Sequence, residues 1–127
     1  KRDWGFAKEY VEGMYLMLQQ EKPDDFVLAT GNTYRVREFV ELAFKAIEVE
    51  VDWKGMDEDE KGYCKATGKL IVSINPKFYR PAEVEILVGN PKKSLDILKW
   101  ESKTSLEELC NMMVSADIKK NNENKSF

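Results

Sequence analysis

The fold is decided by a short stretch near the start of the chain, FVLATGN at residues 26–32. Five uncharged residues are followed by Gly31-Asn32, a dipeptide that breaks a strand. A run of this length and composition is typical of a strand buried on both faces, as in a parallel sheet covered by helices. The rest of the chain offers no evident parallel partner, so we expect the sheet neighbours of this strand outside these 127 residues.

Amphipathic helices are predicted on both sides of this strand. Apolar side chains recur at the spacing of one helix face between residues 7 and 20, and Asp3 upstream suits a cap or first-turn acid. A turn containing Pro23 ends this helix. Residues 36–47 follow the helical template most closely.

The second half of the chain is predicted to mix short strands and helices. Apolar and acidic residues alternate at 49–53, and a second strand is predicted at 69–74, with a solvated loop at 55–68 between them. A short helix is predicted to begin at Pro91, and the TSLE pattern at 104–107 predicts a capping box that opens the last helix. The fold class is therefore mixed α/β.

Composition excludes several kinds of chemistry. The chain has no histidine, which removes imidazole bases and histidine-ligated metals, and two cysteines are too few for a four-ligand zinc site. Its 20 basic and 23 acidic residues give a net charge of -3, so no basic field for nucleic acid is expected. No apolar run is long enough to span a bilayer. We expect a cytoplasmic protein that binds neither nucleic acid nor a membrane, with Cys110 in the core.

Two groups of residues are candidates for a binding site. In Arg80-Pro81-Ala82-Glu83, the guanidinium suits a phosphate and the carboxylate suits the hydroxyls of a ribose. Arg2, beside Asp3 and Trp4, is a second candidate for a phosphate contact. Spacing alone favours solvated surface pairs in both places. Phe78 and Tyr79 fit a core position better than stacking on a base.

Five blocks of this sequence resemble the C-terminal part of the GDP-mannose 4,6-dehydratase family, which are extended short-chain dehydrogenases/reductases. The blocks together span most of residues 1–118, and the first and last are distinctive for this family: RDWGFAKEYV at 2–11, MLQQ at 17–20, DFVLATG at 25–31, VREFVE at 36–41 and FYRPAEV at 78–84. Two departures are Phe6, where the family usually has histidine, and Arg35, which replaces a capping serine and leaves capping to Thr33.

The resemblance implies a division of the chain. Residues 1–31 would form the edge of a Rossmann-type nucleotide-binding domain, residues 32–118 the smaller domain that holds the GDP-sugar, and residues 119–127 a flexible polar tail. In the family, NADP takes a hydride from C4 of the mannose, a carboxylate removes the C5 proton, water leaves from C6, and the hydride returns there. The product is a 4-keto-6-deoxy sugar nucleotide that leads to GDP-fucose.

The resemblance also assigns site residues. Arg80 matches the arginine that contacts the diphosphate and Glu83 the acid that contacts the ribose, with Arg2 a further GDP contact. The catalytic residues and the glycine-rich NADP turn would precede Lys1, so the chain alone is expected to be inactive, within an enzyme that is a homo-oligomer, a dimer or tetramer. Two alternatives remain: another nucleotide-sugar enzyme of the same fold, a reductase or epimerase, and a stand-alone nucleotide-sugar binding module.

Overall fold

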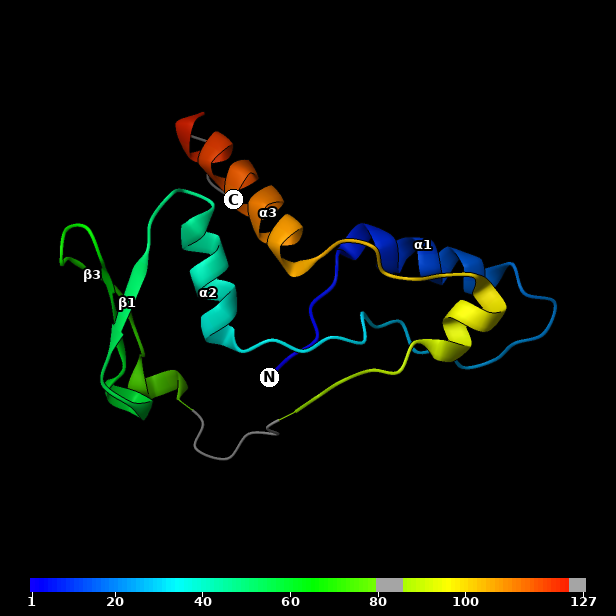
Figure 1. The fold of residues 1–127 in the computed structure, drawn as a ribbon. Coiled ribbons are helices and arrows are strands. Elements are labelled where there is room, and N and C mark those ends of the chain that lie inside the picture. The colour runs from blue at the N-terminus through cyan, green and yellow to red at the C-terminus, as the bar shows by residue number, and fades with distance from the viewer. Residues whose placement is uncertain (80–85, 124–127) are drawn as a thin grey trace.

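A computed structural model describes residues 1–79 and 86–123 (Figure 1). The mixed α/β fold predicted from the sequence is confirmed. In chain order the elements are α1 (Ala7–Leu18), α2 (Val36–Lys45), β1 (Val51–Lys54), the 3-10 turn η1 (Asp57–Asp59), β2 (Lys61–Cys64), β3 (Leu70–Ser73), the 3-10 turn η2 (Pro76–Phe78), the π-helical turn η3 (Ser94–Leu98) and α3 (Leu106–Asn122). No helix among these is both long and apolar enough to cross a bilayer.

The three strands form an antiparallel sheet in the order β1-β2-β3. Val51 pairs with Cys64 at one end of the β1-β2 ladder, and Lys61 pairs with Ser73 between β2 and β3. The predicted strands at 49–53 and 69–74 are thus confirmed with shifted ends. The prediction of a loop at 55–68 is wrong in part, because this stretch contains η1 and the central strand β2.

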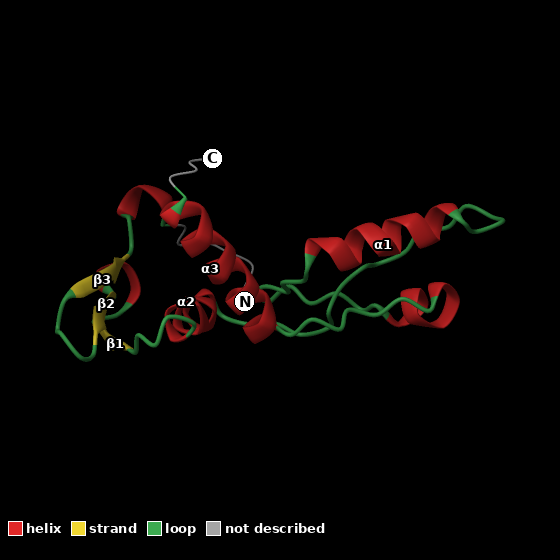
Figure 2. Ribbon diagram, turned by 90° about the horizontal axis from the view of Figure 1, so that it is seen from above, coloured by secondary structure: helices red, strands yellow, loops and turns green. Residues whose placement is uncertain are grey.

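The elements gather into two lobes. In the first lobe, α1 packs against η3, and in the second lobe, α2 packs against α3 beside the sheet. Figures 1 and 2 show the lobes at opposite ends of an elongated chain, joined by a neck of extended segments. The buried apolar residues divide in the same way, with Ala29, Leu98 and Trp100 in the first lobe and Leu106, Leu109 and Cys110 in the second. The predicted core position of Cys110 is confirmed, and burial raises the pKa of its thiol.

Two helix starts differ from prediction by their capping residues. The Ser105 hydroxyl accepts from the Glu108 N–H at 3.2 Å, and the Glu108 carboxylate accepts from the Ser105 N–H at 2.8 Å, so the capping box of α3 lies one residue later than predicted. At α2 the cap is Arg35 rather than Thr33. A guanidinium has no acceptor, and the Arg35 N–H instead donates to the Glu38 carboxylate at 2.5 Å.

The predicted strand at residues 26–30 is not part of a sheet. Within the described part of the chain, no ladder joins the backbone of these residues to another strand. The Ser94 hydroxyl donates to the Val27 carbonyl at 2.6 Å, and Asp3 accepts from the Thr30 N–H at 3.1 Å. Backbone groups inside a folded protein are almost always paired. The expectation that the sheet neighbours of this strand lie outside these 127 residues stays a prediction.

A large apolar surface is exposed on the first lobe. The stripe that predicted α1, Val11, Met14, Tyr15 and Leu18, faces outward, and Leu18 is 82% exposed. The whole chain exposes 9883 Å². A folded monomer of 14.7 kDa exposes about 6,900 Å². The difference, about 3,000 Å², is several times the roughly 800 Å² that one partner buries in an interface of standard size.

Candidate functional site

Of the three predicted site residues, only Arg2 lies in the described part of the chain. Arg80 and Glu83 fall within residues 80–85, outside the described residues, so their roles stay predictions. Phe78, just before them, is 72% exposed. Its predicted core position is wrong, because the short turn η2 presents the ring to solvent beside Lys77.

Arg2 lies in the neck, next to the residues that cross between the lobes. Its N–H donates to the Tyr34 carbonyl and its carbonyl accepts from the Tyr34 N–H, both at 2.9 Å. The guanidinium Nη1 donates to the carbonyl of Lys1 at 2.9 Å. The backbone of Arg2 is thus held in a two-bond bridge, while its side chain stays half-buried at the surface.

A pocket of about 360 Å³ adjoins Arg2. Its polar residues come from the first part of the chain, and its apolar wall comes from the two segments that run beside each other through the first lobe: Arg2, Asp3 and Tyr10, with residues 27–29 and 87–89. A cationic group at the rim of an apolar hollow suits a ligand that combines a phosphate with a less polar body.

Asp3 ties the start of the chain to the end of the predicted strand. Its Oδ1 accepts from the Thr30 N–H at 3.1 Å and from the Thr30 hydroxyl at 2.6 Å, and its Oδ2 accepts from the Gly31 N–H at 3.0 Å. The prediction that Asp3 caps α1 is wrong, since the N-cap is Phe6, which makes no side-chain cap bond. Three donors 27 and 28 residues away satisfy the carboxylate instead.

Glu9 likewise anchors the neck by accepting hydrogen bonds from a distant segment, residues 102–104. Its carboxylate accepts from the Ser102 hydroxyl at 2.8 Å, the Lys103 N–H at 3.3 Å, and the N–H and hydroxyl of Thr104 at 3.0 and 2.7 Å. Burial alone would raise the pKa of Glu9, but the hydrogen bonds from Thr104, Ser102 and Lys103 outweigh it and lower the pKa. The indole N–H of Trp100 also donates to the Glu9 carbonyl at 2.7 Å.

Tyr10 is not arranged as a catalytic base. Its ring lies 5.7 Å from that of Trp100, centroid to centroid. Burial raises the pKa of the phenol, and the negative charges of Asp3 and Glu9 raise it further. The raised pKa does not favour loss of the phenol proton, and the ring of Tyr10 packs beside that of Trp100.

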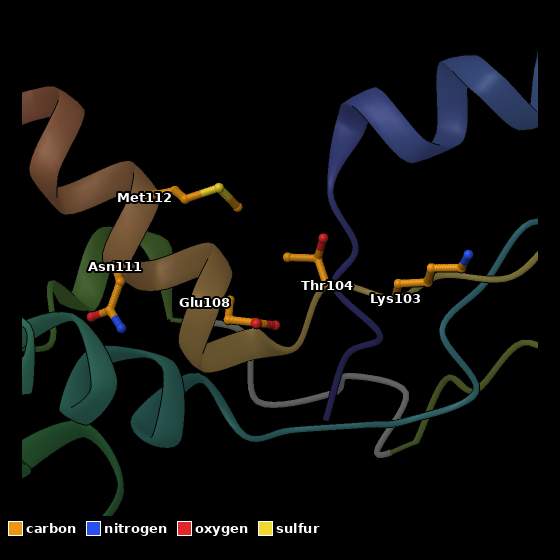
Figure 3. A pocket seen from close by; sticks show the side chains of 5 residues that line it. All are labelled: Lys103, Thr104, Glu108, Asn111 and Met112. Carbon is orange, nitrogen blue, oxygen red and sulfur yellow. The ribbon is translucent and has the colours of Figure 1, made fainter.

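A second hollow lies at the start of α3. Five side chains line it, Lys103, Thr104, Glu108, Asn111 and Met112, around about 470 Å³ (Figure 3). Two of its polar groups already have structural partners, since Thr104 donates to Glu9 and Glu108 completes the α3 cap. The hollow offers no arrangement of groups that would carry out a reaction.

Sequence reasoning missed the anchoring role of both carboxylates, because it assigned Asp3 to a helix cap and did not single out Glu9. Their partners lie 27 to 28 and 93 to 95 residues away, so no local spacing could reveal them. One local signal existed for Glu9, an acid in the first turn of a helix, but this position also suits a simple interaction with the helix dipole.

The described elements form a mixed α/β fold, and comparison with known proteins identifies the family to which the chain belongs. The family model described as GDP-mannose 4,6 dehydratase matches residues 1–113, and the chain belongs to this family. The GDP-mannose 4,6 dehydratase of Dictyostelium discoideum is 58% identical over 118 residues, which are 93% of this chain and 33% of the relative. Those of Cricetulus griseus and Homo sapiens are each 49% identical over 93% of the chain and 32% of the relative. The chain spans about a third of the length of the curated relatives it matches.

Proposed function

We propose that these residues are the C-terminal, GDP-sugar-binding part of a GDP-mannose 4,6-dehydratase, an enzyme that converts GDP-D-mannose to GDP-4-keto-6-deoxy-D-mannose with NADP. The observation that carries this proposal is the 58% identity to the Dictyostelium discoideum relative over 93% of the chain. Arg80 would hold the diphosphate, Glu83 the ribose, and Arg2 would add a further contact to GDP. The whole enzyme would be a cytoplasmic homo-oligomer, a dimer or tetramer.

The division of the chain follows from the same proposal. Residues 1–31 would complete the nucleotide-binding domain, residues 32–118 would form the substrate domain, and residues 119–127 a flexible polar tail. The packing of η3 against α1 supports counting residues 94–98 with the first part, and α3 continues through Asn122, past the expected start of the tail. The backbone of residues 26–30, which joins no ladder within the described part of the chain, and the outward stripe of α1 support a nucleotide-binding domain that covers them.

NADP itself does not fit the residues present. The sequence contains no glycine-rich turn of the kind that cradles a pyrophosphate, because its seven glycines are scattered. The groups that would hold the cofactor and carry out catalysis therefore belong to the part of the relatives that these residues do not match. This chain would bind and orient the substrate.

The test joins this chain behind the amino-terminal two thirds of the Dictyostelium discoideum relative. The chimera should convert GDP-mannose to the 4-keto-6-deoxy product, as identified by mass spectrometry. A reduced or epimerised product would instead indicate a sister enzyme, and tight GDP binding by the 127 residues alone, as a dye-silent monomer, would indicate a stand-alone module.

The predicted anchor is tested in the same chimera. Arg80→Ala should weaken binding of GDP-mannose by about 2 to 4 kcal/mol, about 30- to 1,000-fold, because a charge-assisted bond to the diphosphate is lost. Arg35→Ala, on the start of α2, is a matched control that removes a guanidinium elsewhere and should leave affinity unchanged. Unchanged affinity of the Arg80 variant would refute its assignment.

A further inference from the structure

Arg2 and Asp3 are adjacent in the sequence, and one distant segment holds the backbone of Arg2 and the side chain of Asp3. The segment is residues 30–34, which wraps around the start of the chain between α1 and α2. Tyr34 exchanges two backbone hydrogen bonds with Arg2, and Thr30 and Gly31 give three donors to Asp3. The backbone of Arg2 is therefore held directly by its own bridge to Tyr34, and the carboxylate of the next residue holds the start of the same segment.

The wrapping segment is itself braced. The Thr30 hydroxyl, which donates to Asp3, accepts from the Asn32 N–H at 3.1 Å, so the hydroxyl links Asp3 to the turn that leads to Tyr34. Loss of the Asp3 carboxylate would leave the Thr30 and Gly31 N–H groups without their acceptor and free the turn to move. The bridge between Tyr34 and Arg2 would then shift with it.

We propose that Asp3 is a positioning residue for substrate binding, whose carboxylate fixes the backbone from which Arg2 reaches the diphosphate of a nucleoside-diphosphate sugar. This inference rests on the proposed function, in which Arg2 contacts GDP. Asp3 touches no substrate group in this role. It acts through Arg2, by holding residues 30–34 around the root of that side chain.

Charge alone makes the opposite prediction. A carboxylate next to Arg2 repels an anionic diphosphate, so its removal should tighten binding if Asp3 acts only through the electric field. If Asp3 positions Arg2, the removal should weaken binding. The sign of the change therefore separates the two effects.

The experiment uses the chimera, with KM and kcat for GDP-mannose and the dissociation constant for GDP as readouts. Arg2→Ala should raise KM for GDP-mannose and the dissociation constant for GDP about tenfold. It should change kcat less, because a contact to the diphosphate stabilises the ground state and the transition state alike. Asp3→Asn should raise KM and the dissociation constant about fivefold. In the Arg2→Ala background, Asp3→Asn should add less than about twofold, since residues that act through each other are not additive.

Two further variants keep the test sharp. Thr30→Val removes one of the three donors to Asp3 and replaces the test if Asp3→Asn does not fold. It should raise the GDP dissociation constant by a smaller factor, about two- to threefold. Glu9→Gln is the matched control, because it also neutralises a carboxylate that anchors the neck. It should lower the melting temperature as Asp3→Asn does but leave the GDP dissociation constant unchanged.

Three results would overturn the inference. First, Asp3→Asn could leave the GDP dissociation constant unchanged or lower it. Second, the fold-changes of Asp3→Asn and Arg2→Ala could multiply in the double variant, which would show that the two residues act independently. Third, Arg2→Ala could itself leave the dissociation constant unchanged. In the last case the proposed function stands if Arg80→Ala still weakens binding. A chimera that makes no product from GDP-mannose refutes the proposed function instead.

Discussion

Replacement of Glu9 by alanine should destabilise the neck measurably. The carboxylate accepts four hydrogen bonds, two from backbone N–H groups and two from hydroxyls. A hydrogen bond to a charged group contributes about 1.5 to 3 kcal/mol. The hydroxyls of Ser102 and Thr104 and the exposed N–H of Lys103 can turn to water, so the total stays far below four such bonds. We expect about 2 to 3 kcal/mol for Glu9→Ala, mostly from the Thr104 N–H, and about 1 kcal/mol for Glu9→Gln.

Urea unfolding and amide hydrogen exchange measure this effect. The urea midpoint should fall, and the Thr104 amide should exchange much faster in Glu9→Ala, whereas the amide of Gly62 in the central strand should change only with global stability. Equal protection of the Thr104 amide in both proteins would refute the reasoning.

The pH dependence of the free energy of unfolding gives a second test of the Glu9 carboxylate. The pKa of Glu9 is lowered below its ordinary value of 4.5 in the folded chain. A group with a lowered folded pKa contributes stability above its unfolded pKa, and this contribution is lost as the pH falls through the folded pKa. The stability difference between wild type and Glu9→Gln should therefore be full at pH 7 and shrink below about pH 4.5. A difference that grows on acidification would contradict the assignment.

Three further changes test the packing. Gly89→Ala should lower the free energy of unfolding in urea by about 2 kcal/mol, because its new Cβ would lie 2.3 Å from the Ala29 Cβ. Gly68→Ala, whose Cβ would meet nothing within 4 Å, should lower it by no more than about 1 kcal/mol. Equal losses would contradict the close approach of Gly89 to Ala29. Ser94→Ala should cost about 1 to 2 kcal/mol by leaving the Val27 carbonyl without its donor, and an unchanged midpoint would argue against that bond. The isolated chain should bind a hydrophobic dye through the outward stripe of α1, and Leu18→Lys should reduce the signal; a dye-silent monomer would count against a missing covering domain.

Elements with a regular pattern could be predicted from the sequence. The strands β1 and β3 carry runs of apolar residues, alternating in β1, and α2 has a clear apolar stripe. The central strand β2 was missed because its sequence is KGYC, where a glycine takes the buried position. The side chains of Val51, Val72 and Trp53 pack closely against Gly62. Because the buried position carries no apolar side chain, the sequence of β2 shows no alternation of apolar and polar residues.

The capping error at α3 has a similar cause. Thr104 and Ser105 are each followed three residues later by a glutamate, so the local pattern fits both. Glu9, 95 residues earlier, accepts from the Thr104 hydroxyl and N–H and leaves Ser105 as the cap. The site is limited in the same way, because Asp3 and Glu9 are recognisable only once the neck is formed.

The neck also determines how the polypeptide can be divided. The first lobe is built from residues 7–30 and 91–100, and the second from residues 36–79 and 106–122, so neither lobe is one continuous stretch. A truncation after residue 79 would remove Trp100 from α1 as well as α3 from α2. Contacts that join distant parts of a chain also slow folding, since long loops must close first. Neither lobe could be cut out as one continuous stretch, and the second lobe of a nascent chain would stay incomplete until α3 had been synthesised.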